Sequence, residues 1–157
     1  MKILFLGDIV GPSGCMVVKK HLKKIVDENK INFVIANGEN AAHNGVGITK
    51  DVLDNLIKFG VNVLTTGNHV WDHKETLKLV EDDNRLLRPF NLIGVSPGKG
   101  FEIYQTSKNL KIGVLNLMGN VFMRKSEDVF KTAENFQKKY QLKKDYDFLV
   151  VDLHCET

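Results

Sequence analysis

The chain has 157 residues, 43% of them hydrophobic and 26% charged, which is typical of one soluble domain with a substantial core. Its 22 basic and 19 acidic residues leave a net charge of +3, a near balance that gives no signal for nucleic-acid binding. No apolar run approaches the roughly 20 residues that cross a bilayer, and no signal peptide is recognisable, so no membrane partner is expected. Two cysteines far apart in the sequence fit a reduced cytoplasmic location better than a disulfide scaffold, although two thiols also permit one bridge.

Strand and helix patterns alternate from the N-terminus, which predicts an α/β fold. Lys2–Leu6 is a short, continuous apolar run, as expected for a strand covered on both faces. A helix is predicted from an N-cap at Ser13 to about Asn29, and Ile31–Ala36 is the second strand. The apolar stripe of the first helix consists of Val18, Leu22 and Ile25.

The second helix and third strand follow the same pattern. Thr49 is the predicted cap of a helix that stops at Gly60, with Leu53, Leu56 and Ile57 facing inward. Val61–Thr65 reads as a buried strand. Another helix is expected to begin near Asp72, because Asp72 and Glu75 have the spacing of a capping box. This interpretation of Asp72 is preferred to a catalytic role.

The last part of the chain predicts a hairpin, a helix and a final strand. Phe101–Thr106 and Leu110–Leu117 are the two strands of the hairpin. Ser126 is the expected start of the helix, and Tyr146–Leu153 is a strongly apolar, buried strand that leads directly into His154. The residues expected to share one face of that helix are Val129, Ala133, Phe136 and Tyr140.

Polar, metal-competent side chains follow four of these strands. If the strands are parallel neighbours, their carboxyl ends meet at one rim of the sheet, where open α/β sheets bind ligands. Each side chain taken singly is also a plausible turn former, loop charge or strand-end histidine, but recurrence at four strand ends favours a site. The side chains concerned are Asp8, Glu39, Asn40, Asn68, His69 and His154.

Carboxylates and imidazoles without thiolates suit manganese, iron or zinc rather than a structural zinc site. One acidic residue can bridge two cations held about 3.5 to 4 Å apart, as in two-metal hydrolytic sites. Such a pair neutralises the charge of a phosphate ester and activates water. The donor set therefore predicts phosphoester hydrolysis.

The motifs at these strand ends resemble a known superfamily. Gly7-Asp8, Gly38-Glu39-Asn40, Gly67-Asn68-His69 and Asp152-Leu153-His154, in this order, look like the calcineurin-like metallophosphoesterases. More narrowly, the segments 37–43 and 66–72 resemble the YmdB-like bacterial phosphodiesterases, and this resemblance covers the whole chain. It implies layered β-sheets flanked by helices.

Two departures from the wider superfamily favour the YmdB-like branch. Val10 stands where the superfamily usually has the histidine of an Asp-x-His motif, and Glu39 stands where a bridging aspartate is usual. The family also continues past this point and contributes a Gly-x-His-x-His element. The resemblance therefore predicts that residues 1–157 are the N-terminal part of a longer, single metallophosphoesterase domain, incomplete at its C-terminus.

The resemblance also implies roles for the metal-competent residues. Asp8 would bind the first metal, Glu39 would bridge both, and Asn68 and His154 would bind the second. Asn40 would contact the first metal or the phosphate of the substrate.

Two further histidines complete the predicted site. His69 would be the general acid that protonates the leaving oxygen, a task that suits an imidazole at neutral pH. His43 lies in the loop beside Glu39 and Asn40 and is a candidate substrate contact, although a mobile polar loop residue is an equal interpretation.

The activity implied by the resemblance is hydrolysis of cyclic nucleotides, in 2',3'- and 3',5'-forms, with two divalent cations. Homo-oligomers occur in the resembling family. Two alternatives stay open: a metal-dependent phosphomonoesterase or nucleotidase, and a catalytically silent regulatory or binding protein.

Overall fold

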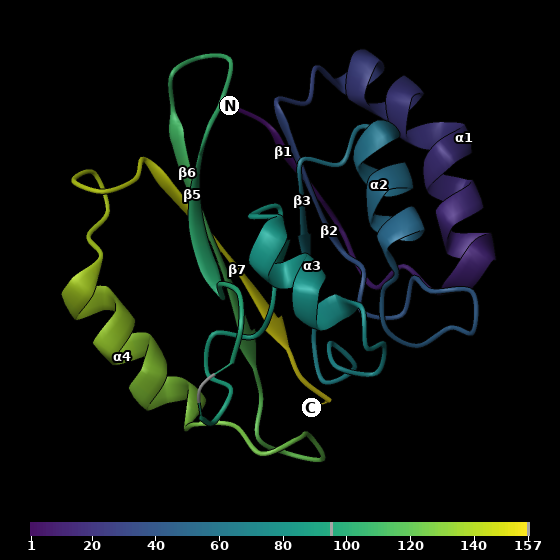
Figure 1. Ribbon diagram of the computed structural model, residues 1–157. Helices are drawn as coiled ribbons and strands as arrows, with labels where there is room; N and C mark the ends of the chain where they lie inside the picture. The colour runs from purple at the N-terminus through teal and green to yellow at the C-terminus, as the bar shows by residue number, and fades with distance from the viewer. Residues whose placement is uncertain (95, 157) are drawn as a thin grey trace.

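Two β-sheets lie face to face between layers of helices in the computed structural model, which describes residues 1–94 and 96–156 (Figure 1). The first sheet has four parallel strands in the order β1-β2-β3-β4. The second has three strands in the order β5-β6-β7, with β6 antiparallel to β5 and parallel to β7. The strands are β1 (Ile3–Leu6), β2 (Phe33–Asn37), β3 (Val63–Thr65), β4 (Leu86–Leu87), β5 (Phe101–Gln105), β6 (Lys111–Met118) and β7 (Phe148–His154). The helices are α1 (Gly11–Asn29), α2 (Lys50–Lys58), α3 (Thr76–Asp82) and α4 (Val129–Lys139).

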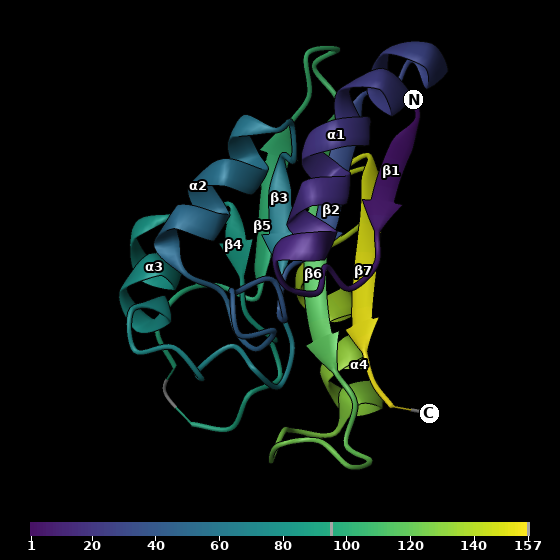
Figure 2. The same ribbon diagram turned by 90° about the vertical axis from the view of Figure 1, so that its right-hand side faces the viewer.

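Alternation along the strands builds three hydrophobic clusters and so explains the layers. On β2, Val34 and Ala36 pack with residues of α1, α2 and α3, whereas Phe33 and Ile35 pack against β6 of the other sheet. The outer face of the second sheet is covered by α4, with Phe136 at the centre of the third cluster. Figures 1 and 2 show α1 and α2 on one outer side and α4 on the other. The α/β class predicted from the sequence is therefore confirmed.

The first helix differs at its start from the prediction. It begins at Gly11 with Val10 as the N-cap, and Ser13 lies inside its first turn, where its hydroxyl donates to the Val10 carbonyl at 3.4 Å. Of the predicted stripe, Val18 and Leu22 are buried, but Ile25 is 38% exposed, and Val26 packs against the core cluster in its place. Within the described residues, no helix combines the length and hydropathy that a membrane crossing requires.

The second helix matches the prediction more closely. Thr49 is its N-cap position, and Leu53 and Leu56 are buried against the first sheet. Gly60 follows the helix with φ of +112°, a backbone conformation that glycine adopts without steric cost.

Three predictions in the second half are wrong in detail. Strand β4 was not predicted, since a two-residue strand carries no periodicity. Helix α3 begins at Thr76 and not near Asp72. Helix α4 begins at Val129, not at Ser126, because Asp128 is its N-cap and accepts a hydrogen bond from the Lys131 backbone N–H at 2.7 Å.

The last strand is only partly buried, contrary to the prediction. Within the described residues, strand β7 pairs only with β6 and so lies at an edge of the second sheet, where Val151 and Leu153 are 45% and 49% exposed. Its other face points inward, and Asp152 on that face is buried. The assumption that all four site-bearing strands share one sheet is also wrong, because β7 belongs to the second sheet.

Candidate functional site

The carboxylate of Glu39 is the centre of a polar cluster beyond the end of β2. Glu39 is 3% exposed, and its Oε1 lies 3.0 Å from His154 Nε2 and 3.2 Å from Asn40 Nδ2. The Asn37 side chain fixes the turn, because its Oδ1 accepts a hydrogen bond from the Glu39 backbone N–H at 3.0 Å. Burial of a carboxylate is unfavourable unless charged or hydrogen-bonding partners surround it, so this position requires such neighbours.

Asp8, Asn40, Asn68 and His154 extend the cluster around Glu39. Asn40 Nδ2 donates to Asp8 Oδ2 at 2.7 Å, and His154 Nε2 lies 2.9 Å from Asn68 Oδ1. The hydrogen bond with Glu39 raises the pKa of His154, and the partial burial of the imidazole opposes this effect. The structure thus brings together the five residues that the sequence predicted as metal ligands.

Gly67 explains how the third strand approaches the cluster so closely. A Cβ atom at this position would lie 2.1 Å from Glu39 Oε2 and 2.3 Å from His154 Cδ2. Only a residue without a side chain fits between the two groups.

Asp152 joins the two halves of the site across the sheets. Its Oδ2 accepts hydrogen bonds from Asn37 Nδ2, at 2.9 Å, and from the Thr65 hydroxyl. Asp152 therefore ties β7 to β2 and β3, and His154 two residues later reaches Glu39 from the second sheet. This contact, rather than a shared sheet rim, accounts for the meeting of these side chains.

His69 lies next to the cluster, and its side chain contacts Asp72, which the sequence had predicted to cap a helix. Its backbone N–H donates to Glu39 Oε2 at 3.4 Å, and its Nδ1 lies 2.7 Å from Asp72 Oδ2. Asp72 also pairs through Oδ1 with Arg124, from the loop that joins β6 to α4. Hydrogen bonding to His69, together with Arg124, lowers the pKa of the Asp72 carboxyl group.

The capping-box interpretation of Asp72 is therefore wrong. Glu75 is the residue that precedes α3, and the Asp72 side chain bonds to His69 and Arg124 instead. The His-x-x-Asp spacing on a tight turn was the available signal for the first contact. Arg124 is 52 positions from Asp72, and no pattern in the sequence indicated that pair.

His43 stands apart from the cluster. Its Nε2 lies 3.5 Å from Asp51 Oδ2, and its side chain lines a pocket of about 270 Å³ between α1 and α2. Cys15 lines the same pocket, and burial raises the pKa of its thiol, which disfavours a reactive thiolate. A contact between His43 and substrate stays a prediction without support from these contacts.

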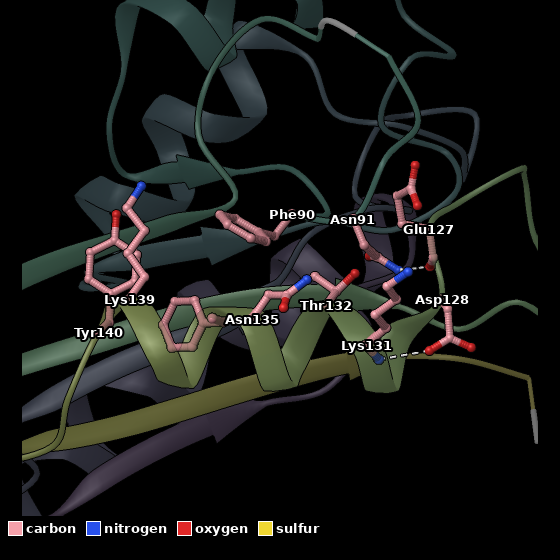
Figure 3. Close-up of a pocket in the computed structure, with 10 residues that line it drawn as sticks. Phe90, Asn91, Glu127, Asp128, Lys131, Thr132, Asn135, Lys139 and Tyr140 are labelled. Carbon is pink, nitrogen blue, oxygen red and sulfur yellow. Dashed lines mark hydrogen bonds between the residues drawn. The ribbon is translucent and has the colours of Figure 1, made fainter.

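Another pocket, of about 370 Å³, lies between α4 and the segment of Phe90 and Asn91, and contains none of the predicted site residues (Figure 3). Two of its polar side chains have structural roles: Asn91 Nδ2 donates to the carbonyl oxygens of Met118 and Glu127, and Asp128 caps α4. The pocket is therefore separate from the chemistry around Glu39.

The side chains of the cluster around Glu39 are chemically suited to bind divalent cations. Its donors are carboxylate, amide and imidazole groups, which suit hard or borderline metal ions. Within residues 1–94 and 96–156, His, Cys, Asp and Glu alone form no metal-binding group of three or more. The set becomes large enough only when the amides of Asn40 and Asn68 are counted. Both lie within hydrogen-bonding distance of its acidic or imidazole members.

The fold and site define an α/β protein whose polar site lies beyond the strand ends and unites two facing sheets. The chain belongs to the family of YmdB-like proteins, whose model matches residues 4–157.

Individual relatives agree with this membership. The 2',3'-cyclic-nucleotide 2'-phosphodiesterase of Bacillus subtilis (strain 168) is 38% identical over 157 residues, which cover 100% of this chain and 58% of that protein. A hypothetical protein from Thermus thermophilus superimposes with a TM-score of 0.90 and 33% identity, covering 100% of this chain and 59% of that structure. A structure described as a novel phosphatase of Mycoplasma pneumoniae gives a TM-score of 0.89 and 32% identity, covering 100% of this chain and 56% of that one. The chain therefore spans between half and two thirds of the length of these relatives.

Proposed function

We propose that the protein to which this chain belongs is a metal-dependent phosphodiesterase that hydrolyses cyclic nucleotides of the 2',3'- or 3',5'-class. The observation that carries the proposal is the meeting of Glu39, Asn68 and His154 from two different sheets at hydrogen-bonding distances. The related phosphodiesterase of Bacillus subtilis supports the substrate class. The layered architecture agrees with the resemblance to the calcineurin-like metallophosphoesterases.

Two divalent cations would complete the site, with manganese or iron as the leading candidates and zinc as the third. Asp8 and Asn40 would hold the first cation, Glu39 would bridge, and Asn68 and His154 would hold the second. Bound there, the cations would neutralise phosphate charge and make water a better nucleophile. The low exposure of Glu39 supports this assignment, because a buried carboxylate requires charged or hydrogen-bonding partners, and cations would add to those it has.

His69 is assigned the role of general acid. The bond between phosphorus and the leaving ribose oxygen breaks, a water oxygen forms a new bond to phosphorus, and the imidazole gives its proton to the leaving oxygen. The attacking water loses its proton to solvent, which later restores the imidazole. Asn40 would donate to a phosphate oxygen as an alternative to its metal contact.

The test is hydrolysis by the full-length protein supplied with manganese or iron. His69→Ala is expected to lower kcat by about 10²- to 10⁴-fold, the usual contribution of a general acid, with unchanged metal content. His21→Ala is the matched control, because His21 lies exposed on α1. Unchanged turnover by His69→Ala would refute the role.

A phosphomonoesterase is the second candidate, favoured by the similarity to a structure described as a phosphatase. Comparing kcat/KM for a cyclic diester and for the corresponding monoester separates the two activities. A full-length protein that holds fewer than two metal ions and hydrolyses neither ester would instead be a silent regulatory protein.

A further inference from the structure

The imidazole of His69 is engaged on one side only. Its Nδ1 lies 2.7 Å from Asp72 Oδ2, and within the described ranges of the chain no hydrogen bond engages Nε2. The two side chains are 35% and 26% exposed, so the pair lies at the surface of the site and not in the core. A histidine whose Nδ1–H is held by a carboxylate has Nε2 as its only nitrogen for contact with a substrate.

Asp72 is itself held from a second direction. Its Oδ1 pairs with the guanidinium of Arg124, so each carboxylate oxygen has its own partner. His69 and Asp72 follow β3, whereas Arg124 comes from the loop between β6 and α4. The ion pair therefore joins loops from the two sheets beside the site.

We propose that Asp72 is a positioning residue for His69 and that Arg124 fixes the orientation of Asp72. The carboxylate keeps the proton on Nδ1 and prevents rotation of the ring, which directs Nε2 toward the substrate. This inference rests on the proposed function, because orientation of the ring affects turnover only if His69 is the acid. Asp72 acts through His69 and does not itself touch the substrate.

The kinetic test uses Asp72→Asn in the full-length, metal-loaded protein with two substrates. For 2',3'-cyclic AMP, whose leaving group is a sugar oxygen that requires a proton, kcat is expected to fall about 10- to 100-fold, while KM changes less than about threefold. For bis(p-nitrophenyl) phosphate, kcat is expected to fall less than about threefold, because nitrophenolate leaves without a proton. Arg124→Leu should act in the same direction with a smaller loss.

Asp83→Asn is the matched control. Asp83 is also a partly exposed aspartate paired with an arginine, since Arg85 Nη2 lies 2.6 Å from its Oδ2, but it precedes β4 outside the polar cluster. Its kcat should stay within about twofold of the wild type on both esters. Equal losses by Asp72→Asn on the two esters, or no loss on either, would overturn the positioning role.

A measurement that does not depend on catalytic activity tests this inference separately from the proposed function. Nitrogen-15 NMR of the His69 ring, assigned by the signal missing in His69→Ala, should show the Nδ1–H tautomer in the wild type. In Asp72→Asn the Nε2–H form should increase, because the amide can donate to Nδ1. If the wild type hydrolyses no phosphoester, the proposed function fails. Independently of that result, an unchanged tautomer in Asp72→Asn would show that Asp72 does not fix the proton position on the His69 ring.

Discussion

The close packing around Gly67 shows that the geometry of the site depends on a single residue without a side chain. The backbone at this position passes between Glu39 and His154, which come from opposite sheets, and the space left is smaller than one methyl group. Both neighbours are candidate metal ligands. Any added atom must therefore displace a ligand or shift the backbone after β3.

Gly67→Ala is expected to reduce both metal binding and stability. The new Cβ would overlap Glu39 Oε2 and His154 Cδ2, at 2.1 and 2.3 Å, and overpacking of this kind costs about 1 to 3 kcal/mol. Gly7→Ala is the control, because a Cβ at Gly7 meets nothing within 4 Å. Metal content and thermal unfolding of the full-length variants measure the effect, and wild-type metal binding by Gly67→Ala would contradict it.

The sequence predicted the candidate metal ligands better than the residues that hold His69 in place. Asp8, Glu39 and His154 could be found because each comes within three residues of the end of an apolar run. Asp72 could not, since Asp72 and Glu75 satisfy a local capping rule that the tertiary contacts override. Arg124 lies in a loop whose position depends on packing between the sheets, and no local pattern reports such packing.

Among the helices and strands, the predictions were best where hydrophobic periodicity was strong. Helix α2 and the β5-β6 hairpin were found close to their limits, whereas the two residues of β4 gave no pattern at all. Strand β7 was misread as fully buried, because its exposed face also carries apolar side chains such as Val151 and Leu153. Hydropathy alone cannot distinguish an edge strand of this kind from a central one.

The connection from α3 to β4 contains an ion pair with a testable pH dependence. Asp83 Oδ1 accepts from the Arg85 backbone N–H and Nε, both at 2.9 Å, and these contacts lower the pKa of the Asp83 carboxyl group. A depressed folded-state pKa stabilises the protein above the pKa of an unfolded aspartate, about 4, and this stability is lost as pH falls through the lower folded value.

Asp83→Asn should therefore lower the free energy of unfolding by about 0.5 to 1 kcal/mol at neutral pH, a small value because the pair is partly solvated. The difference from the wild type should shrink as the pH falls below about 4. Urea unfolding of both proteins over this range measures it. A difference that grew in acid would show that the carboxylate is not stabilised in the folded state.

At the scale of the whole molecule, the decisive arrangement is that of the two sheets. Periodicity identifies strands but does not assign them to sheets, so the position of β7 opposite β2 and β3 could not be predicted. Asp152 is the buried polar residue that connects them, through Asn37 Nδ2 and the Thr65 hydroxyl. Its Oδ2 atom thus accepts one hydrogen bond from β2 and one from β3.

Asp152→Ala is expected to destabilise the protein by about 1 to 3 kcal/mol, because it leaves the buried donors of Asn37 and Thr65 with only a long hydrogen bond of 3.4 Å each, to the carbonyl oxygens of Thr66 and Ala36. Asp27→Ala is the control on the exposed surface of α1 and should change stability by less than about 0.5 kcal/mol. Chemical unfolding of the full-length variants measures both. Equal stability of the two variants would show that Asp152 does not join the sheets energetically.

The bond from Asn37 to Asp152 spans 115 positions, and it has a consequence for the order of events during synthesis. The four parallel strands emerge from the ribosome first and can pair among themselves, but His154 belongs to the last strand described. Contacts between such distant positions form slowly, because a long loop must close before they stabilise the chain. A nascent chain will therefore contain Asp8, Glu39 and Asn68 in a nearly complete first sheet, and yet lack the contact between Glu39 and the imidazole of His154 until β7 has docked.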